Sequence, residues 1–355
     1  MPATLLRPVL SALGLTQIRH VAAVRRRRAT ATVVRVYQQM EEDFGVLAPP
    51  VGLHAPAPEV LAATWTLLRE TLIVPGTAPR ATKEAVATAV SLGNACPYCA
   101  TIHNSALSLL GIADREAGAE WDVEALADWV LLPQRPDGPP APPFPPEQTA
   151  ELVGVAVLLH YLNRMTNVFL RDVPLPPGVP DLALSPVLWV LSRVLVRASR
   201  APHRPGESLD LLPAAALPDD LMWARDNESV AGAFARACAA MDEAGRRSVP
   251  PEVRALVVEN LAGWRGGLRG ISRSWVEELI SGLPERDRAG GRLALLVAFA
   301  SYQVDDGIVE QARRAGGLDD RTLVELCSWA AMVAARRVSA LLPLPPEADR
   351  KSDPS

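Results

Sequence analysis

Lysine is almost absent from this sequence: only Lys83 and Lys351 occur, and nearly all of the 36 basic residues are arginine. Aromatic residues are also scarce, at 5% of the chain, and the apolar residues are chiefly Ala, Leu and Val. That balance favours helices over sheets. The formal net charge of −4 gives the chain no overall attraction for nucleic acid, so no nucleic-acid partner is expected. The one basic run, Arg25 to Arg28, is interpreted as a solvated helix face, with contact to an acidic surface or a neighbouring subunit as the alternative.

Long apolar runs are missing as well, because no segment reaches the ~18 uninterrupted apolar residues of a membrane span. The two best candidates, residues 152–162 and 293–302, have the length of buried core helices. Near the N-terminus the apolar stretch precedes the arginine run, which is the reverse of the order in a secretory signal peptide. These patterns predict a cytoplasmic protein without a membrane segment. In that compartment a close cysteine pair is more often catalytic, redox-sensing or metal-binding than structural.

No run of alternating β-branched residues predicts a strand. Apolar residues instead recur at three- and four-residue spacing, for example through 60–72, so the sequence predicts an all-α fold. Proline-rich passages interrupt the pattern at 132–148, which is expected to be an exposed loop, and at 172–186. At 355 residues the chain exceeds the usual size of a single hydrophobic core, which favours two domains.

The two halves of the sequence resemble each other. An offset of 170 residues aligns 84–107 with 254–277, and a similar offset aligns 147–170 with 320–342. We interpret this as an ancient duplication whose second copy has lost its chemistry. The predicted organisation is a helical arm at 1–30, a first domain at 31–171, a proline-rich linker with one helix at 172–219, a degenerate second copy at 220–347 and a disordered tail at 348–355.

The segment SLGNACPYCATIHNSAL, residues 91–107, carries the most chemistry. Pro97 suits the first turn of a helix, which places Cys96 at the N-cap and Cys99 in the first turn, where the helix dipole favours a thiolate. His103 follows Cys99 by one helical turn and can act as its base. A thiolate that attacks a peroxide becomes a sulfenic acid, and a second thiol nearby condenses with it to a disulfide. On its spacing alone, Glu84 is interpreted as an ordinary acidic residue in the first turn of the preceding helix.

Three other interpretations compete for the cysteine pair. A zinc site needs four ligands, and beyond His103 it would have to recruit Cys238 and Cys327, which lie in Ala-rich helices and read as core residues. A thioredoxin-like motif needs a strand before the first cysteine, whereas the preceding residues are helical. A redox-responsive binding module, which oxidises once without turnover, stays open.

Six residues together resemble a known family: the pattern E-x11-C-x-x-C-x3-H is formed by Glu84, Cys96, Pro97, Tyr98, Cys99 and His103. It is similar to the alkylhydroperoxidase D branch of the carboxymuconolactone decarboxylase superfamily, specifically over about 30 residues from Lys83 to Gly111. The resemblance implies an all-helical bundle in two tandem copies and thiol-dependent reduction of hydroperoxides. It implies that Cys99 forms the sulfenic acid, that Cys96 closes the Cys96–Cys99 disulfide, and that Glu84 and His103 form a proton relay. No cofactor or metal is implied.

The resemblance also implies partners and an assembly. Electrons would come from a dithiol reductant or a lipoyl-type carrier protein, and two copies in one chain imply a homo-oligomer, a trimer. The sequence departs from the family pattern at Tyr98, where some members have a second relay histidine, so the phenol is a candidate relay group. The cysteine-bearing copy also comes first here, whereas it comes second in the known two-domain peroxidases. A decarboxylase-like enzyme acting on a small carboxylated substrate is the alternative within the superfamily.

Overall fold

The computed structural model describes residues 11–116, 122–131, 141–175, 187, 188, 193 and 202–345. Within that part of the chain every regular element is a helix, so the predicted all-α fold is confirmed. The first half contains α2 (Ala31–Gln39), α3 (Pro49–Gly52), α4 (Pro58–Leu68), α5 (Arg80–Gly93), α6 (Pro97–Glu116), α7 (Val123–Leu131) and α8 (Thr149–Phe169). The second half contains α10 (Glu228–Ser248), α11 (Pro251–Ala262), α12 (Ser274–Ile280), α13 (Glu285–Ala300), α14 (Asp306–Gly316) and α15 (Asp320–Ser339).

Short helical turns connect or extend these helices. Two are π-helical, η2 (Met40–Phe44) after α2 and η3 (Arg69–Ile73) after α4. The others are 3-10 turns: η1 (Arg26–Arg28), η5 (Pro146–Gln148), η7 (Leu209–Leu211), η8 (Asp219–Ala224) and η9 (Ser301–Gln303). Within the described part of the predicted arm, 11–30, only 11–15 and η1 are helical. The arginines of η1 are exposed, and Arg26 pairs with Glu41 at 2.6 Å.

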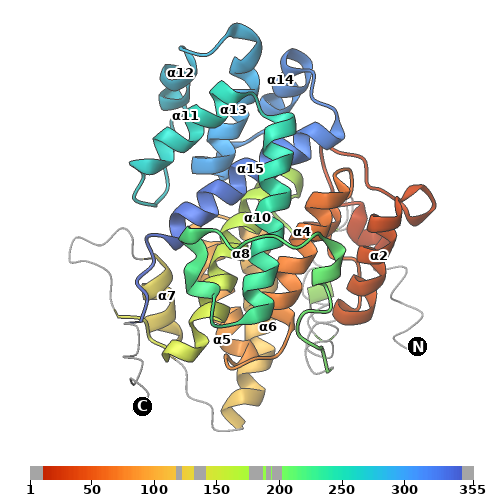
Figure 1. Cartoon of the computed structure of the whole chain (residues 1–355), viewed down its shortest axis with the longest axis vertical. Coiled ribbons are helices and arrows are strands. Elements are labelled where there is room, and N and C mark those ends of the chain that lie inside the picture. Colours follow the sequence, from red (N-terminus) through yellow and green to blue (C-terminus); the bar gives the residue numbers. More distant parts are fainter. Residues whose placement is uncertain are drawn as a thin grey trace, which may run out of the picture.

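The long helix α8 forms the centre of the molecule. It is apolar almost all round, which is the pattern of a helix buried on every side, and nearly all of its residues are buried. It packs against α5 in its own half and against α15 in the other, while α4 packs against α10 (Figure 1). One contiguous apolar core therefore runs through both halves, from Val21 to Leu342. No helix of the described residues is long and apolar enough to cross a membrane.

The halves place their remaining helices at opposite ends of the molecule. Figure 1 shows α5, α6 and α7 at one end and α11 to α14 at the other, with α4, α8, α10 and α15 between them. In the first half α5 packs on α6 and α8, and in the second α13 packs on α14 and α15. The duplication and its domain boundaries stay predictions.

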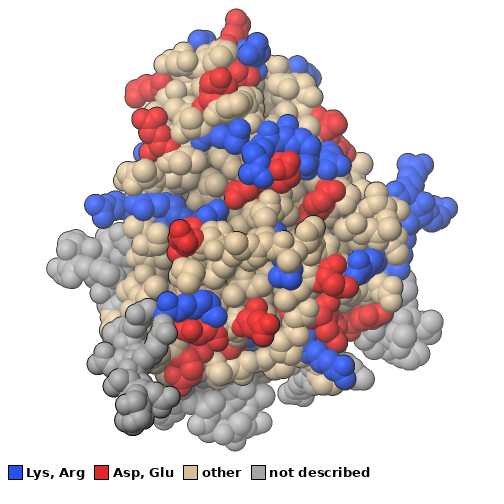
Figure 2. Space-filling view, viewed as in Figure 1, with Lys and Arg blue, Asp and Glu red and all other residues tan. Residues whose placement is uncertain are grey.

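Charges of both signs are interspersed on the surface, and Figure 2 shows no large field of one sign on the face it displays. Ion pairs join many of them, for example Arg247 with Glu325 at 2.6 Å and Arg336 with Asp220 at 2.5 Å. Of the predicted proline-rich segments, residues 132–140 and most of 176–201 lie outside the described residues.

Candidate active site

The cysteine pair sits at the turn between α5 and α6. Helix α5 ends at Gly93, and Ala95 turns the chain with a left-handed φ of 48°, a conformation that L-residues other than Asn and Asp seldom adopt. The backbone N–H of Cys96 donates to the Ser91 carbonyl at 2.9 Å, and the Cys96 carbonyl accepts the first α6 hydrogen bond, from Ala100 at 3.0 Å. Pro97 therefore opens α6 as predicted, with Cys96 at the N-cap and Cys99 in the first turn.

The two thiols are buried, free and chemically different. Cys96 is 1% exposed and Cys99 is 4% exposed. Burial raises the pKa of Cys96 well above its ordinary value, and the neighbouring Cys99 raises it further. Burial opposes ionisation of Cys99 too, but the hydrogen bond from Cys96 and the charge of His103 outweigh it and lower the Cys99 pKa. Of the two thiols, Cys99 is therefore the more easily ionised, and Cys96 is placed to donate a hydrogen bond to it.

Helices α5 and α6 bring Glu84 and His103 into contact. His103 Nδ1 donates to Glu84 Oε2 at 2.7 Å. Burial alone would raise the Glu84 pKa, but Arg80 and His103 bring it down to about 2, so this carboxylate stays ionised. Burial alone would lower the His103 pKa, but the charges of Glu84 and Cys99 raise it. Because Nδ1 is engaged with Glu84, Nε2 is the nitrogen left to exchange a proton.

Two residues of this site escaped the sequence reasoning. Arg80 donates through Nε and Nη2 to Glu84 Oε1, at 2.8 and 2.7 Å, and its i,i+4 spacing from Glu84 was the available signal. Thr166 comes from α8, and no local pattern points to it. Its buried hydroxyl makes no hydrogen bond of good geometry among the described residues, yet it lies close enough to Cys99 to help stabilise the thiolate. Glu84 itself lies one turn deeper in α5 than predicted, since the first turn of that helix holds no acidic residue.

The remaining candidates form no hydrogen bond to Glu84 or His103 among the described residues. Tyr98 is 4% exposed, and burial strongly raises its pKa. Cys238 in α10 and Cys327 in α15 are buried thiols whose pKa burial raises, to about 12 for Cys238. In the part of the chain that the structure describes, no three His, Cys, Asp or Glu side chains converge as metal ligands.

Comparison with known proteins places the chain in a family. It is 38% identical over 330 residues to a curated alkyl hydroperoxide reductase of Mycobacterium tuberculosis (strain ATCC 25618 / H37Rv). The aligned region covers 90% of this chain and 94% of the relative. No protein-family model matches the sequence. No solved structure matches it significantly either. On the strength of this similarity over nearly the whole of both sequences, the chain belongs to the alkylhydroperoxidase-like family of alkyl hydroperoxide reductases.

Proposed function

We propose that this protein is a peroxidase that reduces organic hydroperoxides through the thiols of Cys99 and Cys96. The single observation that carries the proposal is the division of roles between the two thiols. The neighbours of Cys99 lower its pKa against the effect of burial, whereas Cys96 keeps its proton and donates a hydrogen bond to it. A thiolate is the nucleophilic form of cysteine, so the site holds one nucleophile and one thiol in reserve.

The reaction balances in two steps. The Cys99 thiolate attacks the outer oxygen of the hydroperoxide, the O–O bond breaks, and the alkoxide leaves as an alcohol with a proton from the site. Cys99 is then a sulfenic acid. The Cys96 sulfur attacks the Cys99 sulfur, hydroxide leaves as water with the proton that Cys96 gives up, and the Cys96–Cys99 disulfide forms.

The proton for these steps comes, in this proposal, from the Arg80–Glu84–His103 line. The ionised Glu84 holds His103 through Nδ1, and the raised His103 pKa keeps a proton available on the ring near neutral pH. Arg80 fixes the other carboxylate oxygen of Glu84, so the relay is held from both sides. Tyr98 forms no hydrogen bond to Glu84 or His103 among the described residues, and its role as a relay group stays a prediction.

A dithiol reductant would restore the thiols. A cavity of about 560 Å³ is lined by Ala95 and Pro97, the two neighbours of Cys96, and its wall carries Asp172, Asp305 and Asp306 together with Arg19. This position favours attack on the Cys96 sulfur, which would release Cys99. The acidic wall favours a neutral dithiol or a lipoyl-type group over an anionic thiol such as glutathione.

The test is turnover. The reduced protein is given an excess of cumene hydroperoxide with dihydrolipoamide as reductant, and peroxide consumption is followed by an iron–xylenol orange assay. We expect many equivalents consumed per chain, no consumption by Cys99→Ser, and a sulfenic acid on Cys99 in Cys96→Ser that dimedone traps.

Cys238→Ser is the matched control because it removes a buried thiol of α10 that is not among the groups acting on Cys99. It is expected to keep the rate of the unaltered protein. Oxidation that stops after one equivalent would instead make the protein a redox-responsive binding module. Undiminished consumption by Cys99→Ser would overturn the proposal.

A further inference from the structure

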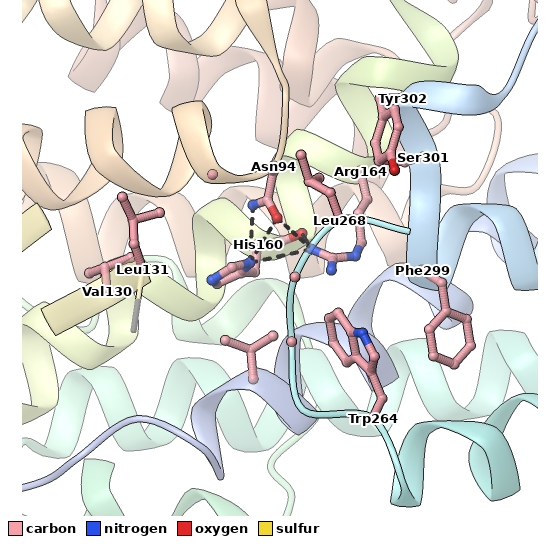
Figure 3. A pocket seen from close by; sticks show the side chains of 14 residues that line it. Asn94, Val130, Leu131, His160, Arg164, Trp264, Leu268, Phe299, Ser301 and Tyr302 are labelled. Atoms are coloured by element: carbon pink, nitrogen blue, oxygen red, sulfur yellow. Dashed lines mark hydrogen bonds between the residues drawn. The ribbon is translucent and has the colours of Figure 1, made fainter. Parts of the chain in front are cut away.

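A second polar site lies next to the turn that carries the cysteines, where Gly93 and Asn94 line a cavity. The cavity has a volume of about 40 Å³ and is lined by the end of α5, by α8 and by the glycine-containing loop after α11, together with residues of α7, α13, η9 and α15. Its polar lining includes Asn94, His160 and Arg164, and its apolar lining includes Trp264 and Phe299 (Figure 3). No step of the proposed peroxidase reaction uses these residues.

Arg164 is a buried cation without a carboxylate. It is 4% exposed and forms no ion pair among the described residues. Its Nε donates to the Ala298 carbonyl at 3.1 Å, its Nη1 donates to the His160 carbonyl at 2.7 Å, and its guanidinium lies 5.9 Å from the centre of the Trp264 ring. Burial lowers the Arg164 pKa only to about 10, so the group is charged at neutral pH. A desolvated charge of this kind is costly unless an opposite charge accompanies it.

His160 adds a second donor that lacks an acceptor. Its Nδ1 lies 3.0 Å from Asn94 Nδ2 and 3.4 Å from Arg164 Nη1. Asn94 Oδ1 lies 3.2 Å from Nδ1 as well, but it can accept from Arg164 Nη1 at 3.4 Å. Because the amide nitrogen of Asn94 is nearer to Nδ1 and an arginine nitrogen can only donate, we assign Nδ1 as the acceptor in this cluster. Burial and the charge of Arg164 lower the His160 pKa well below its ordinary value, which keeps the ring neutral. The single ring proton therefore sits on Nε2, which is buried and has no partner among the described residues.

The two donors call for a ligand that is negatively charged and rich in acceptors. The volume matches a few water molecules, which limits the ligand, or the part of it that enters, to a small group. Trp264 and Phe299 offer apolar contact to a carbon atom beside that group. We propose that this cavity is a binding site for a small carboxylate, held by the guanidinium of Arg164 and by the Nε2–H of His160.

A purely structural role for Arg164 is the competing explanation. The carbonyl of Ala298 belongs to the last turns of α13, whose partial negative charge offsets part of the arginine charge. In that case Arg164 ties α8 to α13 and the cavity holds only water. The structural role predicts a loss of stability when Arg164 is replaced, but no saturable binding of an anion to the unaltered protein.

The test measures that binding directly on the full-length, reduced protein. Sodium acetate is titrated by isothermal calorimetry in chloride-free HEPES buffer, with acetamide as the uncharged ligand of the same shape. We expect saturable binding of acetate at one site per chain and none of acetamide. In Arg164→Met the acetate affinity should fall at least about tenfold, because a charge-assisted hydrogen bond is lost.

Arg269→Met is the matched control. It removes the same charge from the neighbouring loop, where Arg269 stacks on Trp275 and Phe299 but does not line this cavity. Its acetate affinity should stay within about twofold of the unaltered protein. Equal binding by Arg164→Met, or no saturable binding of acetate by the unaltered protein, would overturn the proposal.

A measurement on the unaltered protein covers the case in which Arg164→Met does not fold. Crystals of the full chain are soaked in sodium bromide, and anomalous scattering locates the anion. A bromide peak in contact with the Arg164 guanidinium supports the site, and its absence while other bromide positions are filled counts against it. The inference is independent of the proposed peroxidase activity, since neither measurement involves hydroperoxide or the thiols.

Discussion

At the scale of single residues, the chemistry of Cys99 depends on neighbours from three helices. Cys96 precedes it at the N-cap of α6 and His103 follows it on that helix. Glu84 of α5 holds His103, and Thr166 of α8 lies close to the Cys99 thiol. The helix start and the one-turn spacing of His103 were readable from the sequence, because both are local. The contribution of Thr166 was not readable, since it depends on how α8 packs against α6.

The lowered Cys99 pKa gives a testable pH dependence. A thiol with a pKa below its ordinary 9.0 has a larger thiolate fraction at neutral pH than an ordinary cysteine. As the pH is lowered, the alkylation rate of Cys99 should therefore begin to fall at a lower pH than that of an ordinary cysteine. His103→Ala removes the positive charge and returns the Cys99 pKa toward 9.0. Alkylation of Cys99 at pH 7 should then slow roughly tenfold for each unit of that return. Iodoacetamide labelling followed by mass spectrometry at several pH values measures it.

Two comparisons separate this effect from damage to the fold. Asn104→Ala changes the next residue of α6, which is exposed, and should leave the profile in place. Above about pH 10 the rates of His103→Ala and the unaltered protein should converge, because Cys99 is then ionised in both. A constant rate deficit at every pH would mean that His103 acts only by supporting the structure.

At the scale of elements, the sequence predicted helices where their signals are local. Pro97 marked the start of α6, and the apolar run at 152–162 marked the buried centre of α8. The π-turns η2 and η3 carry no such signal, because they extend helices whose residues look uninterrupted. The left-handed φ of Ala95, in the turn before the cysteines, could not be predicted either, because alanine seldom adopts this conformation.

This backbone conformation makes an unusual prediction about glycine. The left-handed conformation of Ala95 costs about 1–2 kcal/mol, and Ala95→Gly relieves that cost. The greater flexibility of glycine in the unfolded chain opposes this gain by about 0.5–1 kcal/mol. We expect urea titration to show that the free energy of unfolding of Ala95→Gly is higher than that of the unaltered protein by up to about 1 kcal/mol. The matched substitution is Ala239→Gly on the exposed face of α10, which should cost about 1 kcal/mol. A similar loss in both variants would show that Ala95 is not strained.

At the scale of the whole molecule, the two halves share one core instead of forming two. The length of the chain favoured separate domains, but α8 packs on α15 and α4 on α10, so the central helices of each half cover those of the other. Sequence cannot reveal this pairing, because an apolar helix carries no mark of its partner. The packing of α8 also links the two sites, because this helix supplies Thr166 near the thiols and Arg164 in the second cavity.

The last prediction concerns the assembly. The family resemblance implies a trimer of this chain, and the surface offers an apolar contact at the loop between α11 and α12. Ile271 is 98% exposed and Leu268 54% exposed there. Light scattering after size-exclusion chromatography should give three times the chain mass of 38.0 kDa. Ile271→Asp should lower that mass if this loop lies in the interface, because an unpaired charge would have to be buried. A mass of one chain at micromolar concentration would contradict the trimer, and a trimer that tolerates Ile271→Asp would place the interface on another surface.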